Sequence, residues 1–556
     1  VTAGYQSGYR WSASPVSVQE KLGNVIENNV TYALNGGVNL VKLYNKLPYL
    51  KKINEGKNRS RDQLSRMPGQ RGGKDLKAQA NAPDSLLPEK PKFNVGKFLV
   101  EGFLRILMGV RNAKFQYTQG HGIMLPGFTP EPDFMGINLG MNAPGLGFVF
   151  GEQKDIRLKA VERGWMTKDT LLNSAYNVKF NEALNVTASI EPLRDFRIEV
   201  TVTKQQGSYR QEYFKADRNG NFESYSPSFR GSYTMSYILI GTSFTKDEAG
   251  DNNMSVLFEK MMSSRLIIAQ RFAQENPWST GVDSLGYPVG YGPDDQEVLA
   301  VAFLSAYKGQ DPSKIGLTAF PKIPLPNWRI TYDGLSKLKL FRRFLRNLTL
   351  SHSYVSTYSV GNYVSNIQYK EQDGFPTAFN AAGNFIPTRE LNVVTITEQF
   401  SPLIRIDMGW INSLITTFEI RTARNLSFSF ANNQLTEIKN TEYVAGIGYR
   451  FKNIRLNFSG LFGRGRKART TSDLNLKLDF SLRKNKTVLR RIDEEINQVS
   501  SGQQRIAINF SADYNLSASF NIRFYFDKDI MTPYVSNQYR TSNTTGGLAL
   551  RFTLSQ

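Results

Sequence analysis

The residue types that most enzymes use for catalysis are scarce in this sequence. The 556-residue chain has no Cys, which excludes disulfides, thiolate metal sites and cysteine nucleophiles, and only two His, at positions 121 and 352. Two His residues leave little room for zinc sites or for Ser-His-Asp chemistry. No paired carboxylates, nucleophile or metal cluster emerges from the other residues. We therefore predict that the protein is not an enzyme, with no catalytic, cofactor-binding or metal-binding residues and no cofactor.

Three short motifs resemble ligand sites, but each has a simpler interpretation. The stretch DRNGN at Asp217–Asn221 resembles the start of a calcium loop, yet its Gly is fourth rather than sixth and no Glu closes it. The glycine-rich run at Gly286–Gly292 lacks the strand-to-helix context of a nucleotide loop. The basic run at Arg464–Arg469 falls between two strand patterns and is typical of a charged hairpin loop. We interpret the first motif as a hairpin turn.

The charge balance is strongly basic, with 69 Lys+Arg against 48 Asp+Glu and a formal net charge of +21. Such an excess is compatible with a nucleic-acid partner, an anionic membrane surface or a loop system that repels basic material. The most basic segment, residues 42–92, has few aromatic residues that could stack on bases. We expect it to be a solvated loop and expect no nucleic-acid partner.

A two-residue alternation dominates the C-terminal part of the chain. In SDLNLKLDFSLR, at Ser472–Arg483, every even position from Leu474 to Leu482 is a large apolar residue and the odd positions are polar. This period is that of a β-strand with one apolar and one polar face. Similar runs recur, separated by turn-forming residues at Asn432-Asn433 and Lys452-Asn453. We predict an antiparallel up-and-down sheet at least from residue 327 to the end, with sixteen to eighteen such strands in the chain.

Two architectures could keep the apolar faces of these strands out of water. A soluble β-sandwich or barrel would bury them against each other, whereas a transmembrane barrel would turn them toward lipid around a polar interior. No apolar run is long enough for a membrane helix, so a membrane span would have to use strands. The opposite faces are too charged to pack as a dry core, which favours the transmembrane barrel. The predicted lumen-lining residues are Asn475, Lys477, Asp479, Ser481, Asn509, Ser511, Asp513, Ser517, Asn521 and Arg523. The predicted lipid-facing residues are Leu474, Leu476, Leu478, Phe480, Leu482, Ile508, Phe510, Phe520, Ile522, Phe524, Leu550 and Phe552.

The patterns divide the chain into five parts. We expect barrel strands at 1–41, a basic loop at 42–92, strands with loops at 93–245, a helical insertion at 246–326 and the C-terminal strands at 327–556. The first insertion helix is expected over Asn252–Glu275, capped by Asn252 or Asn253. The second is expected to open at Asp294 and to stop at Gly309. Such short helices cannot span lipid, so a cap or periplasmic shelf is the expected arrangement.

Several stretches resemble a known family. They are FPKIPLPNWRITYDGL at Phe320–Leu335, Asn347–Tyr363, Phe400–Trp410, NQLTEIKNTEYVAGIGYRF at Asn433–Phe451 and the tail from Asp473 onward. These resemble the SprA (also called Sov) family, the outer-membrane translocons of the type 9 secretion system of the Bacteroidota. The resemblance covers most of the chain.

The resemblance implies a fold, a location and a set of partners. The fold would be an all-β transmembrane up-and-down barrel of about 36 strands with short helical insertions, of which this chain would be the C-terminal part. The protein would pass folded cargo with C-terminal signal domains across the outer membrane of a Gram-negative bacterium. Implied partners are an upstream segment that completes the barrel, a PorV-like shuttle barrel, a plug protein, cargo and membrane lipids. A self-closed barrel, a TonB-dependent or porin-like transporter and a soluble β-rich adhesin remain alternatives.

Overall fold

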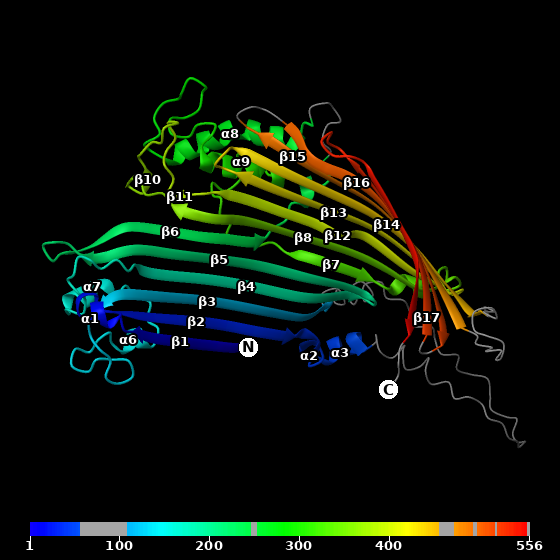
Figure 1. Cartoon of the computed structure of the whole chain (residues 1–556), viewed down its shortest axis with the longest axis horizontal. Helices are drawn as coiled ribbons and strands as arrows, with labels where there is room; N and C mark the ends of the chain where they lie inside the picture. The colour runs from blue at the N-terminus through cyan, green and yellow to red at the C-terminus, as the bar shows by residue number, and fades with distance from the viewer. Residues whose placement is uncertain (56–107, 246–252, 455–471, 493–496, 518–519, 553–556) are drawn as a thin grey trace, which may run out of the picture.

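The protein is one very large antiparallel sheet with helical segments at its margins, as a computed structural model shows (Figure 1). The structure describes residues 1–55, 108–245, 253–454, 472–492, 497–517 and 520–552. Its strands are β1 (Thr2–Ser12), β2 (Asn24–Asn39), β3 (Val110–Phe128), β4 (Tyr176–Leu193), β5 (Phe196–Ala216), β6 (Phe222–Ser236), β7 (Asn327–Tyr332), β8 (Leu345–Ser365), β9 (Glu371–Gln372), β10 (Phe375–Pro376), β11 (Arg389–Glu390), β12 (Val393–Trp410), β13 (Leu414–Ser429), β14 (Gln434–Ile454), β15 (Ser472–Arg491), β16 (Asn497–Ser517), β17 (Phe520–Pro533) and β18 (Thr541–Phe552). Its helices are α1 (Val16–Leu22), α2 (Leu40–Tyr44), α3 (Pro48–Glu55), α6 (Leu146–Val149), α7 (Arg157–Glu162), α8 (Val256–Glu275) and α9 (Gln296–Lys308), with short 3-10 turns η1 (Ile240–Thr242) and η2 (Gly334–Lys337).

The strands follow one another across the sheet almost in chain order. The main sheet has 16 strands in the order β1-β2-β3-β4-β5-β6-β8-β12-β13-β14-β15-β16-β17-β18, with β7 and β11 beside this path. The predicted antiparallel up-and-down sheet is therefore confirmed. Its two outermost strands, β1 and β18, each pair with one neighbour among the described residues, and closure into a barrel stays a prediction.

The sheet is strongly curved and has two distinct ends. In Figure 1 the strands from β1 to β6 lie nearly horizontal, whereas β17 runs almost vertically. Helices α1, α6, α7, α8 and α9 gather over one end of the strands, called here the helical end (Figure 1). Helices α2 and α3 and tight connections such as residues 411–413 lie at the other end, called here the turn end.

Turn chemistry accounts for the tight connections. At the β5–β6 hairpin, the Asp217 carboxylate accepts from the backbone N–H groups of Asn219 and Asn221, each at 2.8 Å, and Gly220 has a φ of +82°. This local network makes the segment a hairpin turn, as predicted. Asn433, with a φ of +46°, lies in the predicted turn between β13 and β14.

The predicted turn at Lys452-Asn453 is wrong. Strand β14 continues through these residues to Ile454, with a register shift against β15 between Phe451 and Ile454. The left-handed Asn453 donates its N–H to the Asp473 side chain at 3.1 Å, which satisfies the donor that the shifted ladder leaves free. The segment is therefore a bulge rather than a hairpin. The strand pattern expected just beyond it lies outside the described residues, as does the basic run at 464–469.

A single strand of the sheet is interrupted by the helical insertion. Strand β6 ends at Ser236, and after the insertion β7 begins at Asn327 and continues beside the same neighbours, β5 and β8. The sequence pattern after the Asp217–Asn221 turn predicts a strand over Phe222–Phe244, whereas β6 ends at Ser236. The chain leaves the sheet at Tyr237, earlier than the expected boundary at residue 246.

Side chains complete the hydrogen bonding at this interruption. The Ser236 hydroxyl accepts from the Thr203 N–H at 3.0 Å and donates to the Thr203 carbonyl at 3.3 Å on β5. On the other side, the Asn327 side-chain carbonyl accepts from the Ser356 N–H at 2.8 Å, and the Tyr237 N–H donates to the Ser356 carbonyl at 3.1 Å. The backbone groups that face the gap thereby keep partners, as buried polar groups require.

The insertion helices differ from expectation at their starts. Helix α8 begins at Val256, not near Asn252, because Asn253 binds the sheet instead of capping: its side-chain oxygen accepts from Lys486 Nζ at 2.7 Å. Helix α9 is capped by Asp295, one residue after the predicted position, and its carboxylate accepts from the N–H groups of Glu297 and Val298. Gly309 ends α9 with a φ of +71°, as predicted.

Two other expectations fall partly outside the described residues. The described beginning of the basic segment, up to Glu55, contains α2 and α3 rather than plain loop. A short helix was expected over Phe93–Val110 before a strand at Arg111–Gln119. The helix lies outside the described residues, and the strand is β3, which extends from Val110 to Phe128.

Replacing Ser236 by Ala should weaken the sheet at the interruption. The substitution leaves the buried Thr203 N–H and carbonyl without their partner, a loss of about 1–3 kcal/mol for an unsatisfied buried group. Hydrogen exchange at the Thr203 amide should become faster, and mass spectrometry of protected peptides would measure it. Ser232→Ala, an exposed position on the same strand, is the control and should change stability by less than about 0.5 kcal/mol. Unchanged protection in the Ser236 variant would contradict the role given to its hydroxyl.

Candidate functional site

The pairing register sorts the predicted residues onto two faces of the sheet. Leu478 of β15 is opposite Phe510 of β16, and Asp479 is opposite Asn509, so like residues continue from strand to strand. The register also aligns Phe524 with Leu548 of β18, and Arg523 with Ala549. The predicted lipid-facing residues thus share one face, called here the apolar face. The predicted lumen-lining residues other than Ser517 share the other, called here the polar face.

At the turn end, the apolar face is exposed. A band of large side chains, called here the apolar band, crosses the sheet there. It includes Tyr5, Tyr32, Leu34, Ile404, Phe418, Tyr443, Ile447, Leu478, Phe480, Phe524, Leu548 and Leu550. These side chains are 40–64% exposed. This exposed fraction is unusually high for a contiguous group of large apolar residues. On β15 the band runs from Leu474 to Leu482, nine residues or about 27 Å at the usual rise per residue.

At the helical end, protein covers the same face. Helices α8 and α9 pack on it over β8, β12, β13 and β14, burying sheet residues that include Tyr358, Val360, Ile396, Leu426 and Phe428. A second cluster, formed with α6 and α7, covers the ends of β2 to β5 around Leu125, Trp165 and Tyr176. One continuous apolar face is therefore covered by helices along half of its length and exposed along the other half.

Ion pairs lie on the apolar face under the helical cover or near its edge. Glu398 of β12 is paired with Arg424 of β13 at 2.9 Å, and Glu437 of β14 with Arg490 of β15, also at 2.9 Å. All four side chains are at most 7% exposed. Lys204 of β5 and Glu182 of β4 form a third, less buried pair at 3.3 Å. Buried charges need such partners. The Glu398–Arg424 pair lies at the edge of the helical cover, and the Glu437–Arg490 pair lies beneath it, where Arg490 contacts Phe258 of α8.

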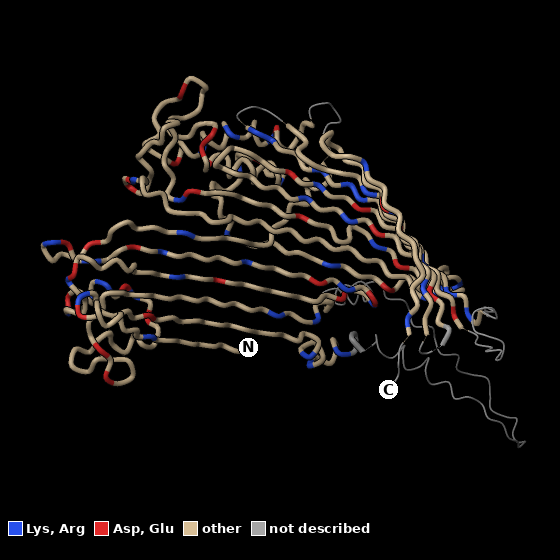
Figure 2. Tube along the Cα trace, viewed as in Figure 1, with Lys and Arg blue, Asp and Glu red and all other residues tan. Residues whose placement is uncertain are grey.

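The polar face carries its charges in pairs. Across β12, β13 and β14, Arg405 contacts both Asp407 and Glu419, and Arg421 contacts both Glu419 and Glu442, at 2.6–3.3 Å. Further along the sheet Arg505 donates to Asp529 at 2.9 Å. Figure 2 shows both signs of charge interspersed along these strands. Scattered exposed apolar residues also occur on this face, at Val355, Ile415 and Ile438.

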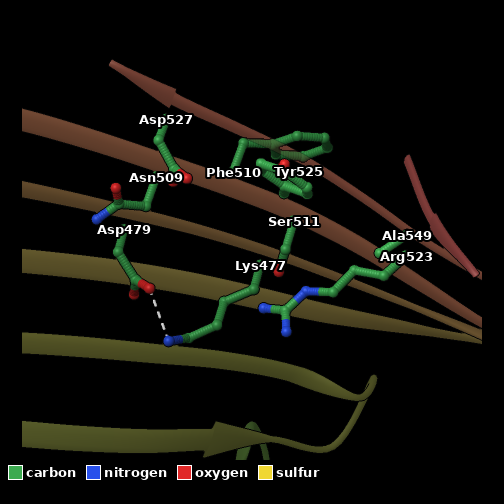
Figure 3. A pocket seen from close by; sticks show the side chains of 9 residues that line it. All are labelled: Lys477, Asp479, Asn509, Phe510, Ser511, Arg523, Tyr525, Asp527 and Ala549. Atoms are coloured by element: carbon green, nitrogen blue, oxygen red, sulfur yellow. Dashed lines mark ion pairs between the residues drawn. The ribbon is translucent and has the colours of Figure 1, made fainter. Parts of the chain in front are cut away.

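Five of the predicted lumen-lining residues come together around one hollow on the polar face. Four strands, β15 to β18, contribute side chains to this hollow (Figure 3): Lys477, Asp479, Asn509, Ser511 and Arg523 border it with Tyr525, Asp527 and Ala549. Lys477 Nζ contacts Asp479 at 2.6 Å, and Arg523 Nε lies 3.5 Å from Asp513. Phe510 also borders the hollow, although its ring packs with that of Phe524, at 6.1 Å between centroids.

Four of the remaining predicted residues lie elsewhere on the polar face: Asn475, Ser481, Asp513 and Asn521. Asn475 is opposite Asp513, and Ser481 is opposite Ala507. The Asn521 amide donates to Asn515. The side chain of Ser517 lies outside the described residues. The pairing register shows which residues share a face of the sheet, but it does not show whether that face lines a water-filled lumen. Their position in a lumen therefore stays a prediction.

Sequence reasoning missed the charged residues on the apolar face of β12 to β15. Four charged residues occupy positions where the alternation of their strands predicts an apolar side chain: Glu398, Arg424, Glu437 and Arg490. Taken singly, each such residue argues against the strand assignment. Their partners lie 26 and 53 residues away in the chain, at positions that only the pairing register brings together. A signal was present nonetheless, because an isolated charge on an apolar strand face predicts an opposite charge on a neighbouring strand.

His352 lies on the apolar face between the band and the ion pairs. Its Nδ1 is 2.6 Å from the Leu403 carbonyl, at the register shift of β12 between Phe400 and Ile404. Its ring neighbours Trp328 and Phe400, at 6.5 and 6.1 Å between centroids. It therefore belongs to an aromatic cluster and satisfies the carbonyl that the bulge exposes.

Comparisons with known proteins supply no relative for this chain. No protein-family model matches it, and no curated protein sequence matches it. Within the described ranges, no group of His, Asp or Glu side chains is arranged to hold a metal ion. In the same part of the chain, no helix is both long and apolar enough to cross a membrane. The sheet with its two contrasting faces is the feature that a functional proposal has to explain.

Replacing Glu437 by Gln should destabilise the folded protein strongly. The substitution leaves the Arg490 guanidinium buried without its carboxylate, and breaking a buried pair in this way costs about 3–5 kcal/mol. The temperature at which the folded form is lost, followed by gel mobility of unheated and heated samples, should fall. Asp529→Asn breaks the exposed Arg505–Asp529 pair and should cost less than about 1 kcal/mol. Equal losses in the two variants would show that burial of the Glu437 pair is unimportant.

Proposed function

We propose that this chain forms part of a transmembrane β-barrel of the outer membrane that conducts proteins. More specifically, we propose the translocon of the type 9 secretion system, the SprA or Sov family, which several of its stretches resemble. The observation that carries the proposal is the pairing of an exposed apolar band with a charge-paired polar face on the same sixteen-stranded sheet. The family assignment rests on the resemblance, and the membrane assignment rests on the sheet.

The dimensions of the apolar band support a membrane location. A transmembrane strand needs about 9–11 residues, and the apolar stretch of β15 from Leu474 to Leu482 has that length. Its central residue, Leu478, is 40% exposed. Exposure of such a band to water would be costly over sixteen strands, since burial of apolar surface contributes about 25 cal/mol per Å². Lipid removes this cost.

The strands are about twice as long as a membrane requires. Strands β5, β8, β14 and β16 have 21 residues each, or about 70 Å at the usual rise per residue. We propose that the turn-end half lies in the membrane and that the helical-end half projects beyond it. The helices and ion pairs on the apolar face then lie outside the hydrocarbon, where charges and ordinary packing are tolerated.

The two outermost strands support a larger barrel. Within hydrocarbon an unpaired strand edge leaves backbone groups without partners, which is not tolerated. β1 and β18 each have one neighbour among the described strands, and β18 is exposed along its length. We propose that an upstream segment of the same translocon, either in the same polypeptide or as a cleaved chain, pairs with both edges.

The polar face would line the passage. Side chains such as Lys477, Asp479 and Arg523 hold water at the wall, and pairing of opposite charges keeps the wall from attracting cargo of one sign. A folded protein could then pass without binding tightly. Cargo with a C-terminal signal domain would leave to a PorV-like shuttle barrel, and a plug protein would close the idle channel. These partners are inferred from the family alone.

A charge in the apolar band should prevent insertion. Leu478→Arg places a guanidinium at the middle of the band, where a charge facing lipid costs about 2–4 kcal/mol. Refolding into lipid vesicles across a urea series should show this loss. Asn509→Arg, which adds the same side chain at an exposed position of the polar face, should insert normally. Equal insertion of both variants would exclude lipid contact at Leu478.

The transport proposal predicts where cargo accumulates. Depletion of the protein should leave cargo with C-terminal signal domains in the periplasm, measured by fractionation and immunoblotting. Restoring the unaltered protein, or the Asn509→Arg variant, should return cargo to the cell surface. Normal secretion in depleted cells would exclude this function without affecting the membrane assignment.

A further inference from the structure

A short segment crosses the apolar face at the boundary between the apolar band and the helical cover. This segment, called here the strap, comprises residues 237–245, which leave the sheet at the β6–β7 interruption. It runs from β8 across β12 to β13. The strap is the part of the helical insertion that lies next to the exposed band.

Buried polar groups of the sheet hold the strap in place. The Tyr354 hydroxyl of β8 accepts from the Leu239 N–H at 2.8 Å. The Ser243 hydroxyl donates to Glu398 of β12 at 2.7 Å, and Arg424 of β13 donates to the Thr242 carbonyl at 3.2 Å. The Glu398–Arg424 ion pair thus serves as the attachment point of the strap. These contacts fix the strap at the row of charges that ends the apolar band.

The strap presents apolar side chains outward at this level. Ile240 is 39% exposed and Phe244 is 57% exposed, whereas Leu239 between the attachment points is buried. The Phe244 ring packs against Phe400 of β12, at 5.2 Å between centroids. Phe400 occupies the next position after Glu398 on the apolar face, two residues closer to the band. Phe244 therefore lies on the band side of the charged row and adds an exposed aromatic ring to the edge of the band.

An aromatic cluster accompanies the strap. Trp328 of β7 stacks on Tyr354 at 4.6 Å, and Tyr354 lies 4.9 Å from Phe400. The cluster spans three neighbouring strands and ends at Phe244 of the strap. Aromatic side chains with a polar atom favour the boundary between hydrocarbon and water, and β-barrels of membranes carry girdles of them there.

We propose that the strap lies in the membrane–water interface and that Ile240 and Phe244 contact lipid near the headgroups. This inference rests on the proposed placement of the apolar band in the membrane. Two observations favour lipid over a protein partner: the strap is continuous with the band, and the charged row lies directly behind it. An interfacial segment of this kind reaches about 5–10 Å into the boundary region. The helical insertion would then be anchored to the sheet on one side and to the bilayer on the other.

Site-directed fluorescence tests the proposal, and the absence of Cys from this chain keeps each label at one position. Single Cys residues would be introduced by Phe244→Cys, Ile240→Cys, Leu478→Cys and Asn219→Cys in the whole protein. Each variant carries a nitrobenzoxadiazole label in vesicles of phosphatidylcholine and phosphatidylglycerol. Spin-labelled phosphatidylcholine, with the quencher either near the headgroup or at mid-chain, reports depth. The unsubstituted protein controls for background labelling.

The expected pattern distinguishes this inference from the proposed function. Labels at Phe244 and Ile240 should be quenched about twofold more by the headgroup-proximal probe than by the mid-chain probe. The Leu478 label should show the opposite order, and the exposed turn residue Asn219 should respond to neither.

Two results would overturn the interfacial placement. If lipid probes quench Leu478 but neither strap position, the strap lies away from lipid and the membrane assignment stands. Protection of the strap labels from aqueous iodide would then identify a protein partner as the occupant. If Leu478 is also unquenched, the membrane placement fails together with this inference.

Discussion

The register of the large sheet gathers the apolar side chains of like parity on one face, and exposing that face to water is costly along its whole length. A shift of one residue in any strand would turn its apolar set onto the opposite face. The helical insertions cover the face at one end of the strands, and the exposed apolar band continues it at the other. Much else in the structure follows from this division. The buried Glu398–Arg424 pair lies where the helical cover gives way to the exposed band, and the Glu437–Arg490 pair lies beneath the helices.

The interruption between β6 and β7 shows how a helical cover can be added without opening the sheet. An insertion at a strand end would leave the ladder intact but would place the helices beyond the strands rather than over their face. Because the chain leaves the sheet in the middle of a strand, the insertion lies directly on the apolar face. The backbone hydrogen bonds between strands are interrupted at that point. Ser236 and Asn327 close that gap with their side chains, and β7 resumes the strand. The same exit fixes the strap at the row of charges, because Tyr237 follows Ser236 immediately.

Local patterns in the sequence predicted the strands and several turns, and long-range contacts explain where they failed. The alternation around Leu478 and the turn at Asp217–Asn221 depend on neighbouring residues, so both were readable. The start of α8 was misplaced because Asn253, a good capping residue, is held by Lys486 and Arg490 from a distant strand. Likewise, a bond from Asn453 to Asp473 converts a turn-forming pair into a bulge. The two faces could be assigned from the sequence, but the ion pairs between strands could not.

The proposed function places a separate requirement on the polar face, since the wall of a passage for varied proteins must be wet without being adhesive. A wall of one charge would hold cargo of the opposite charge, and an apolar wall would bind exposed apolar surface on any cargo. Glu419 lies between Arg405 and Arg421, and each of these arginines has a second carboxylate partner. Each charge on this part of the polar face thus has an opposite charge within a few ångströms, although the whole chain carries a net charge of +21. At a Debye length of about 8 Å in physiological salt, such balanced groups present little field to a passing protein while still binding water. Pairing with an opposite charge reduces the attraction of each charged group for cargo. The polar face, although strongly charged, would therefore bind passing proteins only weakly.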